Sequence, residues 1–170
     1  MKAIISFEFD PDNLGDLARA KKLMEVFNMH NACESEESAS DLIQEAWSKC
    51  SWEVIAFAIA ILQIHDGDSD KGVYAFFESL CNPENQNTCG ELTGRIISSR
   101  VGRTAIVCKK LGTTSRLMHI AVRRKDGVKR VYISHEAKEA LLALLNSSFG
   151  DEFKTHLTKN NLEIPDFSQL

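Results

Sequence analysis

The stretch from Trp52 to Ile64, WEVIAFAIAILQI, limits the possible folds most strongly because it is apolar on nearly every side. A helix of this kind has no face suited to water, so the rest of the chain must surround it. Its longest apolar run, Val54 to Leu62, is far too short to cross a bilayer. The sequence therefore predicts a domain built around a central buried helix, without membrane association.

Other segments show weaker periodicities on either side of this helix. Residues 2–9 alternate between two faces, as a strand does. Apolar residues at helical spacing predict helices over residues 12–28, 40–49 and 72–81, the last with Asp70 as its N-cap. Residues 82–88, NPENQNT, read as a polar linker. The expected fold class is mainly α with a small β component.

The segment after this linker has the signals of two short helices. Thr88 and Glu91 form a capping-box pattern ahead of Leu92, Ile96 and Ile97. We expect a break over residues 98–102 and then a helix over 104–111, closed by Gly112. Its inward side chains would be Ile106, Val107 and Leu111. The β-branched composition of the same segment leaves a strand as the alternative.

A β-hairpin is predicted over residues 117–133. Met118, Ile120 and Val122 alternate with other residues on the first strand, and Val131 and Ile133 do so on the second. Asp126-Gly127 between them is a strong turn signal, since glycine supplies the positive φ that a tight turn needs. Ser134 then caps a helix that continues to Leu145.

The charge of the chain is distributed unevenly. The formal net charge is -4, yet residues 1–91 carry -11, residues 92–130 carry +10 and residues 131–170 carry -3. This asymmetry indicates a polyanion-binding segment beside an acidic module, although exposed hairpin edges are also often basic. We expect an acidic, mostly helical module over 1–87, a basic module over 88–148 and a tail over 149–170.

Two stretches of the basic module, GELTGRIISSRVGRTAIVCKKLG and HIAVRRKDGVKRVYISHEAKEALLALL, carry a resemblance to a known family. Over about residues 88–145 the order of helix, turn, helix, basic hairpin and helix resembles the winged helix-turn-helix of MarR-like bacterial transcription regulators. The resemblance implies a helix in the DNA major groove and a hairpin wing beside it.

The candidate DNA contacts are the basic and polar residues of this module. Arg103, Thr104 and Lys109 would lie near the major groove, and Lys110 and Arg116 along the backbone. The wing would add five cations that neutralise phosphates and release counterions: Arg123, Arg124, Lys125, Lys129 and Arg130.

The function expected from these features is that of a non-enzymatic, sequence-specific DNA-binding transcriptional regulator that acts by occupying an operator. It would bind double-stranded DNA as a homodimer, with residues 2–9 and 135–145 as candidate interfaces. The alternative is an adaptor or inhibitor that binds another protein through residues 1–91. RNA in place of DNA also stays open.

Metal, cofactor and catalytic motifs are weak in this sequence. HDGDSDKGVYAFFE resembles a calcium loop, but Lys71 stands where the loop needs glycine and Phe77 where it needs glutamate. The five cysteines match no closed zinc pattern and suit a reducing compartment. Together with the lack of a signal-peptide pattern, they predict a cytoplasmic protein without cofactor or metal.

Overall fold

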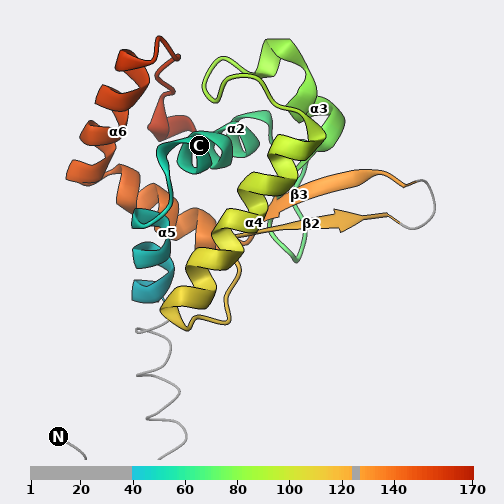
Figure 1. Ribbon diagram of the computed structural model, residues 1–170, viewed down its shortest axis with the longest axis horizontal. Coiled ribbons are helices and arrows are strands. Elements are labelled where there is room, and N and C mark those ends of the chain that lie inside the picture. Colours follow the sequence, from blue (N-terminus) through green and yellow to red (C-terminus); the bar gives the residue numbers. More distant parts are fainter. Residues whose placement is uncertain (1–39, 124–126) are drawn as a thin grey trace, which may run out of the picture. The chain divides into compact units, whose positions relative to one another are not determined.

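The computed structural model describes residues 40–123 and 127–170, which belong to the second of two compact units, Ala39–Leu170. The strand expected over residues 2–9 and the helix expected over 12–28 lie outside the described residues. The described unit is mainly helical and has one three-stranded antiparallel sheet (Figure 1). The predicted fold class is therefore confirmed.

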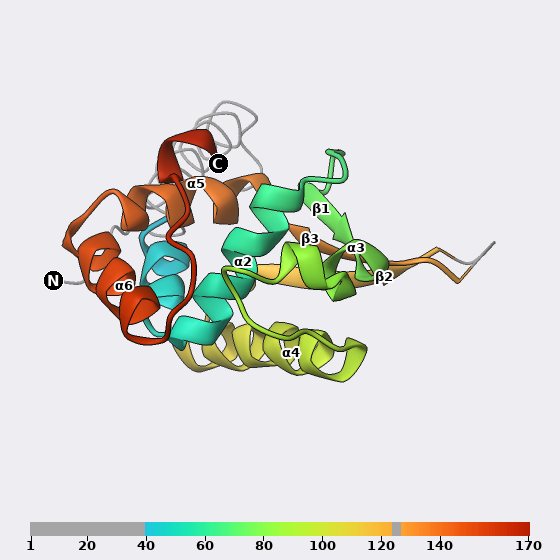
Figure 2. The same ribbon diagram turned by 90° about the horizontal axis from the view of Figure 1, so that it is seen from above.

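The central helix is α2 (Trp52–Ile64), as the sequence predicts. Every residue from Val54 to Leu62 is buried. In Figure 2, α2 lies between α4 on one side of the unit and α5 on the other. The helix Ser40–Ser48 precedes α2 and is joined to α5 (His135–Leu145) because the buried Trp47 donates its Nε1 hydrogen to the Ala137 carbonyl at 2.8 Å.

Strand β1 (Val73–Phe76) lies where the sequence predicts the first half of a helix, so the prediction of helix over residues 72–76 is wrong. Burial alternates along the strand, with Val73 and Ala75 fully buried. Pairing with a distant strand overrides the local helical spacing. Helix α3 (Phe77–Cys81) follows directly, then the 3₁₀ turn η1 (Pro83–Asn85). Asp70 lies in the turn before β1 and caps no helix.

The sheet has the order β1-β3-β2, with β2 (Met118–Val122) and β3 (Lys129–Ile133) forming the predicted hairpin. Strands β2 and β3 extend away from the helices in both views (Figures 1 and 2). Gly127 has the expected positive φ, +69°. Because β1 pairs with β3, the module boundary expected between residues 87 and 88 falls inside this unit.

Helix α4 (Gly94–Leu111) is continuous, so the predicted break over residues 98–102 is wrong. The hydroxyl of Ser98 donates to the Gly94 carbonyl at 2.8 Å, which satisfies this polar side chain within the helix. The predicted capping box is also wrong, because Thr93 caps the helix by accepting from the Ile96 amide. The helical conformation expected for residues 104–111, and Gly112 as C-cap, are confirmed.

The C-terminal part consists of α5, α6 (Ser148–Lys159) and the 3₁₀ turn η2 (Phe167–Gln169). Ser134 caps α5 as predicted, accepting from the Ala137 amide at 3.2 Å. Within residues 40–123 and 127–170, no single helix is long and apolar enough to span a bilayer; Ser40–Ser48 and α2 reach that length and composition only as a pair, bent by 118°.

The seam between β1 and β3 gives a stability prediction at Gly72. This residue has a φ of +115°, and a β-carbon there would collide with the Ile133 carbonyl of β3. We expect Gly72→Ala to lower the free energy of unfolding by more than about 3 kcal/mol, because backbone strain is added to a broken strand pair. Urea denaturation measures this change.

Gly112→Ala is the matched control. Gly112 also has a positive φ, +73°, but no atom lies within 4 Å of a β-carbon placed there. This variant should lose only the cost of a left-handed alanine, about 1–2 kcal/mol. Equal losses at the two positions would contradict the pairing of β1 with β3.

Candidate functional site

One side of α4 is exposed and cationic. It carries Arg95, Arg103, Lys109 and Lys110, all exposed, and no acidic residue occurs from Gly94 to Leu111. The buried side chains of the helix recur on its other side: Ile97, Val101, Thr104 and Cys108. The ion pairs His135–Asp68 and Lys154–Asp151 lie on other elements. The outward side of α4 therefore presents a positive charge that its own helix does not neutralise.

Thr104 does not belong to this exposed side, which corrects the sequence-based expectation. Its exposed fraction is 0%, and its hydroxyl donates to the Val101 carbonyl at 2.7 Å. Because α4 is continuous, Thr104 falls in the buried stripe and not at the first turn of a separate helix. Arg95 was not among the predicted contacts, yet it lies on the same side as Arg103 once the helix is extended to Gly94.

The Arg100 side chain points away from the exposed side and connects α4 to α2 and to the loop at Cys89. Its guanidinium lies 5.7 Å from the centre of the Phe57 ring of α2, and both terminal nitrogens donate to the Cys89 carbonyl at 3.4 Å. Burial lowers the pKa of Arg100 from its usual value, with smaller opposing effects from Cys89 and Glu53. Arginine nevertheless stays charged, so Arg100 serves as a packing and hydrogen-bonding group.

The N-terminal end of α4 and the turn end of the β2–β3 ladder, where Lys129 pairs with Val122, both lie against Phe77. The Lys129 ammonium lies 5.8 Å from the centre of the Phe77 ring, and a β-carbon on Gly94 would lie 3.9 Å from the same ring. The exposed Lys129 is thereby held next to the first turn of α4. We call the exposed side of α4 together with Lys129 the basic face.

Arg130 contributes to packing more than the sequence suggests. Its guanidinium lies 4.6 Å from the centre of the Tyr74 ring and 4.9 Å from that of Phe76. Next to it, His119, Tyr132 and Tyr74 form a row of rings across the three strands. Burial lowers the pKa of His119, followed by the effects of the cations Lys71 and Arg116. This aromatic row stiffens the base of the hairpin.

The remaining predicted contacts divide into two groups. Arg116, in the loop between α4 and β2, and Arg123, at the end of β2, are both exposed. Arg124 and Lys125 lie outside the described residues. Of the ten predicted site residues, those of α4, apart from Thr104, share one side of one helix with Arg95.

A shallow apolar hollow of about 220 Å³ runs beside α4. It lies between Lys49 and Ser51, before α2, and Arg103, Ile106 and Val107 of α4. Cys50 lines it, and burial raises the pKa of this thiol to about 12, with the nearby Cys108 adding to the effect. The hollow lacks the convergent polar groups that orient a bound small molecule.

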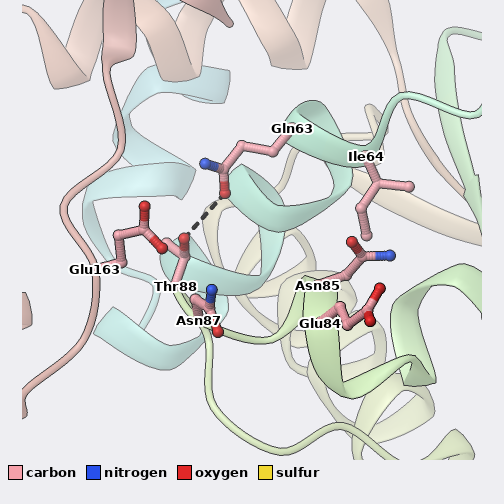
Figure 3. Close-up of a pocket in the computed structure, with 7 residues that line it drawn as sticks. All are labelled: Gln63, Ile64, Glu84, Asn85, Asn87, Thr88 and Glu163. Carbon is pink, nitrogen blue, oxygen red and sulfur yellow. Dashed lines mark hydrogen bonds between the residues drawn. The ribbon is translucent and has the colours of Figure 1, made fainter.

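A second, polar pocket of about 150 Å³ lies where the C-terminal tail crosses the loop after η1 (Figure 3). Glu84 and Glu163 reach it from different segments, and Thr88 donates to Gln63 at 3.0 Å. The Glu163 amide donates to the Asn87 carbonyl at 3.1 Å, so the pocket marks where the tail is attached. Among the described residues, no group of three or more His, Cys, Asp or Glu side chains could hold a metal ion.

No family model matches this chain, and neither the curated proteins nor the solved structures contain a match to it.

The raised pKa of Cys50 predicts that its thiol reacts slowly with alkylating reagents. At pH 8 a thiol with a pKa near 12 is about 10⁻⁴ thiolate, and the thiolate is the reactive form. We expect Cys50 to react with iodoacetamide at least about a hundredfold more slowly in the native protein than in denaturant at the same pH. Peptide mapping by mass spectrometry measures both rates. Similar rates in the two conditions would contradict the burial of Cys50 beside α4.

Proposed function

We propose that this protein is a sequence-specific DNA-binding transcriptional regulator that acts by occupying its operator. The observation that carries the proposal is the basic face: four exposed cations on one side of α4, without an acidic residue on that helix, and Lys129 of the hairpin, which contacts Phe77 near the start of α4. Duplex DNA carries one negative charge per about 1.7 Å of axis, and exposed cations gain affinity by releasing its counterions.

The order of elements supports the resemblance to MarR-like winged helices. Helix α3, the turn η1, α4, the hairpin β2–β3 and α5 follow one another in the sequence, whereas the resemblance implies both helices of the pair after residue 88. The pair of helices is shifted relative to the sequence-based expectation. The first is α3, before residue 88, and the whole of α4 takes the place of the second.

The dimensions of α4 suit the major groove. An α-helix with its side chains is about 10–12 Å across, and the major groove of B-DNA is about 12 Å wide. With the buried stripe against α2, the opposite side of α4 would face the bases. Arg95, Arg103, Lys109 and Lys110 are long enough to reach bases or the flanking phosphates.

The hairpin would act as the second contact. It projects from the helices (Figure 1), and Lys129, the first residue of β3, is held beside the first turn of α4. The backbone amides of that first turn have no intrahelical acceptor and favour an anion. A phosphate between Lys129 and the start of α4 would meet both, which fixes the hairpin along the DNA backbone.

A homodimer is part of this proposal, because one helix reads only a few base pairs and two copies read two half-sites one helical turn apart. The strand over residues 2–9, one candidate interface, lies outside the described residues. On α5, the other candidate, most apolar side chains are buried within the unit and Leu142 is half-buried, which leaves His135, Glu136, Glu139 and Ala143 exposed. A contact through α5 would therefore be largely polar.

The salt dependence of binding tests the basic face. We expect Arg103→Gln with Lys110→Gln to weaken binding to duplex DNA. The slope of log affinity against log salt should flatten by about 0.9 for each phosphate that the variant no longer neutralises. Fluorescence anisotropy at several salt concentrations measures this slope. The hairpin variant with Arg123, Lys125 and Lys129 changed to glutamine should flatten it as well.

Lys154→Gln with Lys159→Gln is the control, since it removes the same charge from α6, outside the basic face and the candidate interface on α5. It should keep the slope and nearly all of the affinity. If the α4 variant behaves like this control, the basic face does not bind DNA. Double-stranded RNA separates the two nucleic acids, because its deep, narrow major groove does not admit a helix, and it should bind more weakly.

A further inference from the structure

Ile106 is an apolar side chain in the middle of the basic face. The sequence predicts it inward, but its exposed fraction is 55%, the largest among the exposed large hydrophobic residues of the described chain. Arg103 lies about one turn before it and Lys109 and Lys110 about one turn after it. An isolated exposed isoleucine on a solvent face would need no explanation, but this one is surrounded by the cations of the proposed DNA-binding surface.

The surface of α4 next to Ile106 lacks a side chain, because residue 102 is glycine. Gly102, one turn before Ile106, has no atom within 4 Å of a β-carbon placed on it. Glycine inside a helix costs about 1 kcal/mol relative to alanine, and nothing within the described unit packs against the position to require it. The missing side chain leaves room for an external group to approach the backbone beside Ile106.

We propose that Ile106 is a specificity-determining residue that contacts the 5-methyl group of thymine in the major groove. This inference rests on the proposed function. Thymine is the one standard base that carries a methyl group on the major-groove edge, and apolar side chains are its natural partners. Where the cations around Ile106 bind phosphates they do so without regard to sequence, whereas a contact of Ile106 with a thymine methyl group discriminates between bases.

The alternative role for Ile106 is to line the hollow beside α4, together with Val107 and Val54. If Ile106 does no more than line this hollow, the affinity for DNA should not depend on thymine methyl groups. A comparison of thymine with uracil distinguishes the two roles, because the bases differ by this methyl group alone and keep the same pairing edges.

The experiment starts from a duplex that wild-type protein selects from a random DNA pool. Each thymine of that duplex is then replaced in turn by deoxyuridine, and affinities are measured by fluorescence anisotropy at constant salt. We expect an about fourfold loss of affinity at each position where Ile106 covers the methyl group. Ile106→Ala should bind the thymine and uracil duplexes at those positions with nearly equal affinity.

Ile164→Ala is the matched control, because Ile164 has a similar exposed fraction, 47%, and lies in the C-terminal tail. It should keep the wild-type preference for thymine. Thermal unfolding of both variants should match that of the wild type, since both side chains are already largely exposed.

The outcomes separate this inference from the proposed function. If wild-type protein binds the selected duplex but no uracil substitution matters, or if Ile106→Ala keeps the wild-type preference, the role of Ile106 is wrong and DNA binding stands. If the pool yields no bound duplex even at low salt, DNA binding fails, and the role of Ile106 fails with it.

Discussion

The pairing of β1 with β3 holds this unit in its arrangement. β1 follows α2 in the chain, so its hydrogen bonds to β3 attach the hairpin to the helix at the centre of the core. The same pairing sets the direction in which the hairpin leaves the body (Figure 2). Without it the hairpin would be a two-stranded ribbon, which is marginally stable by itself in water.

The burial of α2 then decides which side of α4 meets solvent. α4 packs against both α2 and β2, its stripe of Ile97, Val101, Thr104 and Cys108 is buried, and Arg100 adds a contact to Phe57 of α2. Each cation of α4 at the opposite angular positions is turned outward as a consequence. The core thus creates the basic face, because the burial of one stripe fixes the rotation of α4 about its axis and leaves the cations on the solvent side. The proposed recognition of DNA follows from this geometry together with the charge.

Local patterns were sufficient for some elements and not for others. α2, the hairpin and the Ser134 cap of α5 follow from apolar runs, alternation and turn residues within short stretches. β1 does not follow from such local patterns, because its conformation depends on β3, which is far away in the sequence. The continuity of α4 was missed because Ser98, Ser99 and Gly102 are poor helix formers, and their cost is offset by the burial of Ile97 and Val101.

The candidate site was predictable in composition and less so in geometry. The excess of positive charge over residues 92–130 is visible in the sequence and indicates Arg103, Lys109 and Lys110. The orientation of single residues requires the full length of α4, which turns Thr104 inward and Ile106 outward. The packing of Arg130 against Tyr74 and Phe76 depends on the β1–β3 register and could not be anticipated.

An NMR titration of ¹⁵N-labelled protein with duplex DNA is the decisive measurement for the basic face. If this face binds DNA, amide shifts should concentrate on α4 around Arg95, Arg103 and Lys110, extend to Lys129 at the start of β3, and fade as salt is raised. α5 and α6 should stay unchanged. Shifts confined to α5 and α6, or the absence of any shift at low salt, would show that the basic face does not bind DNA.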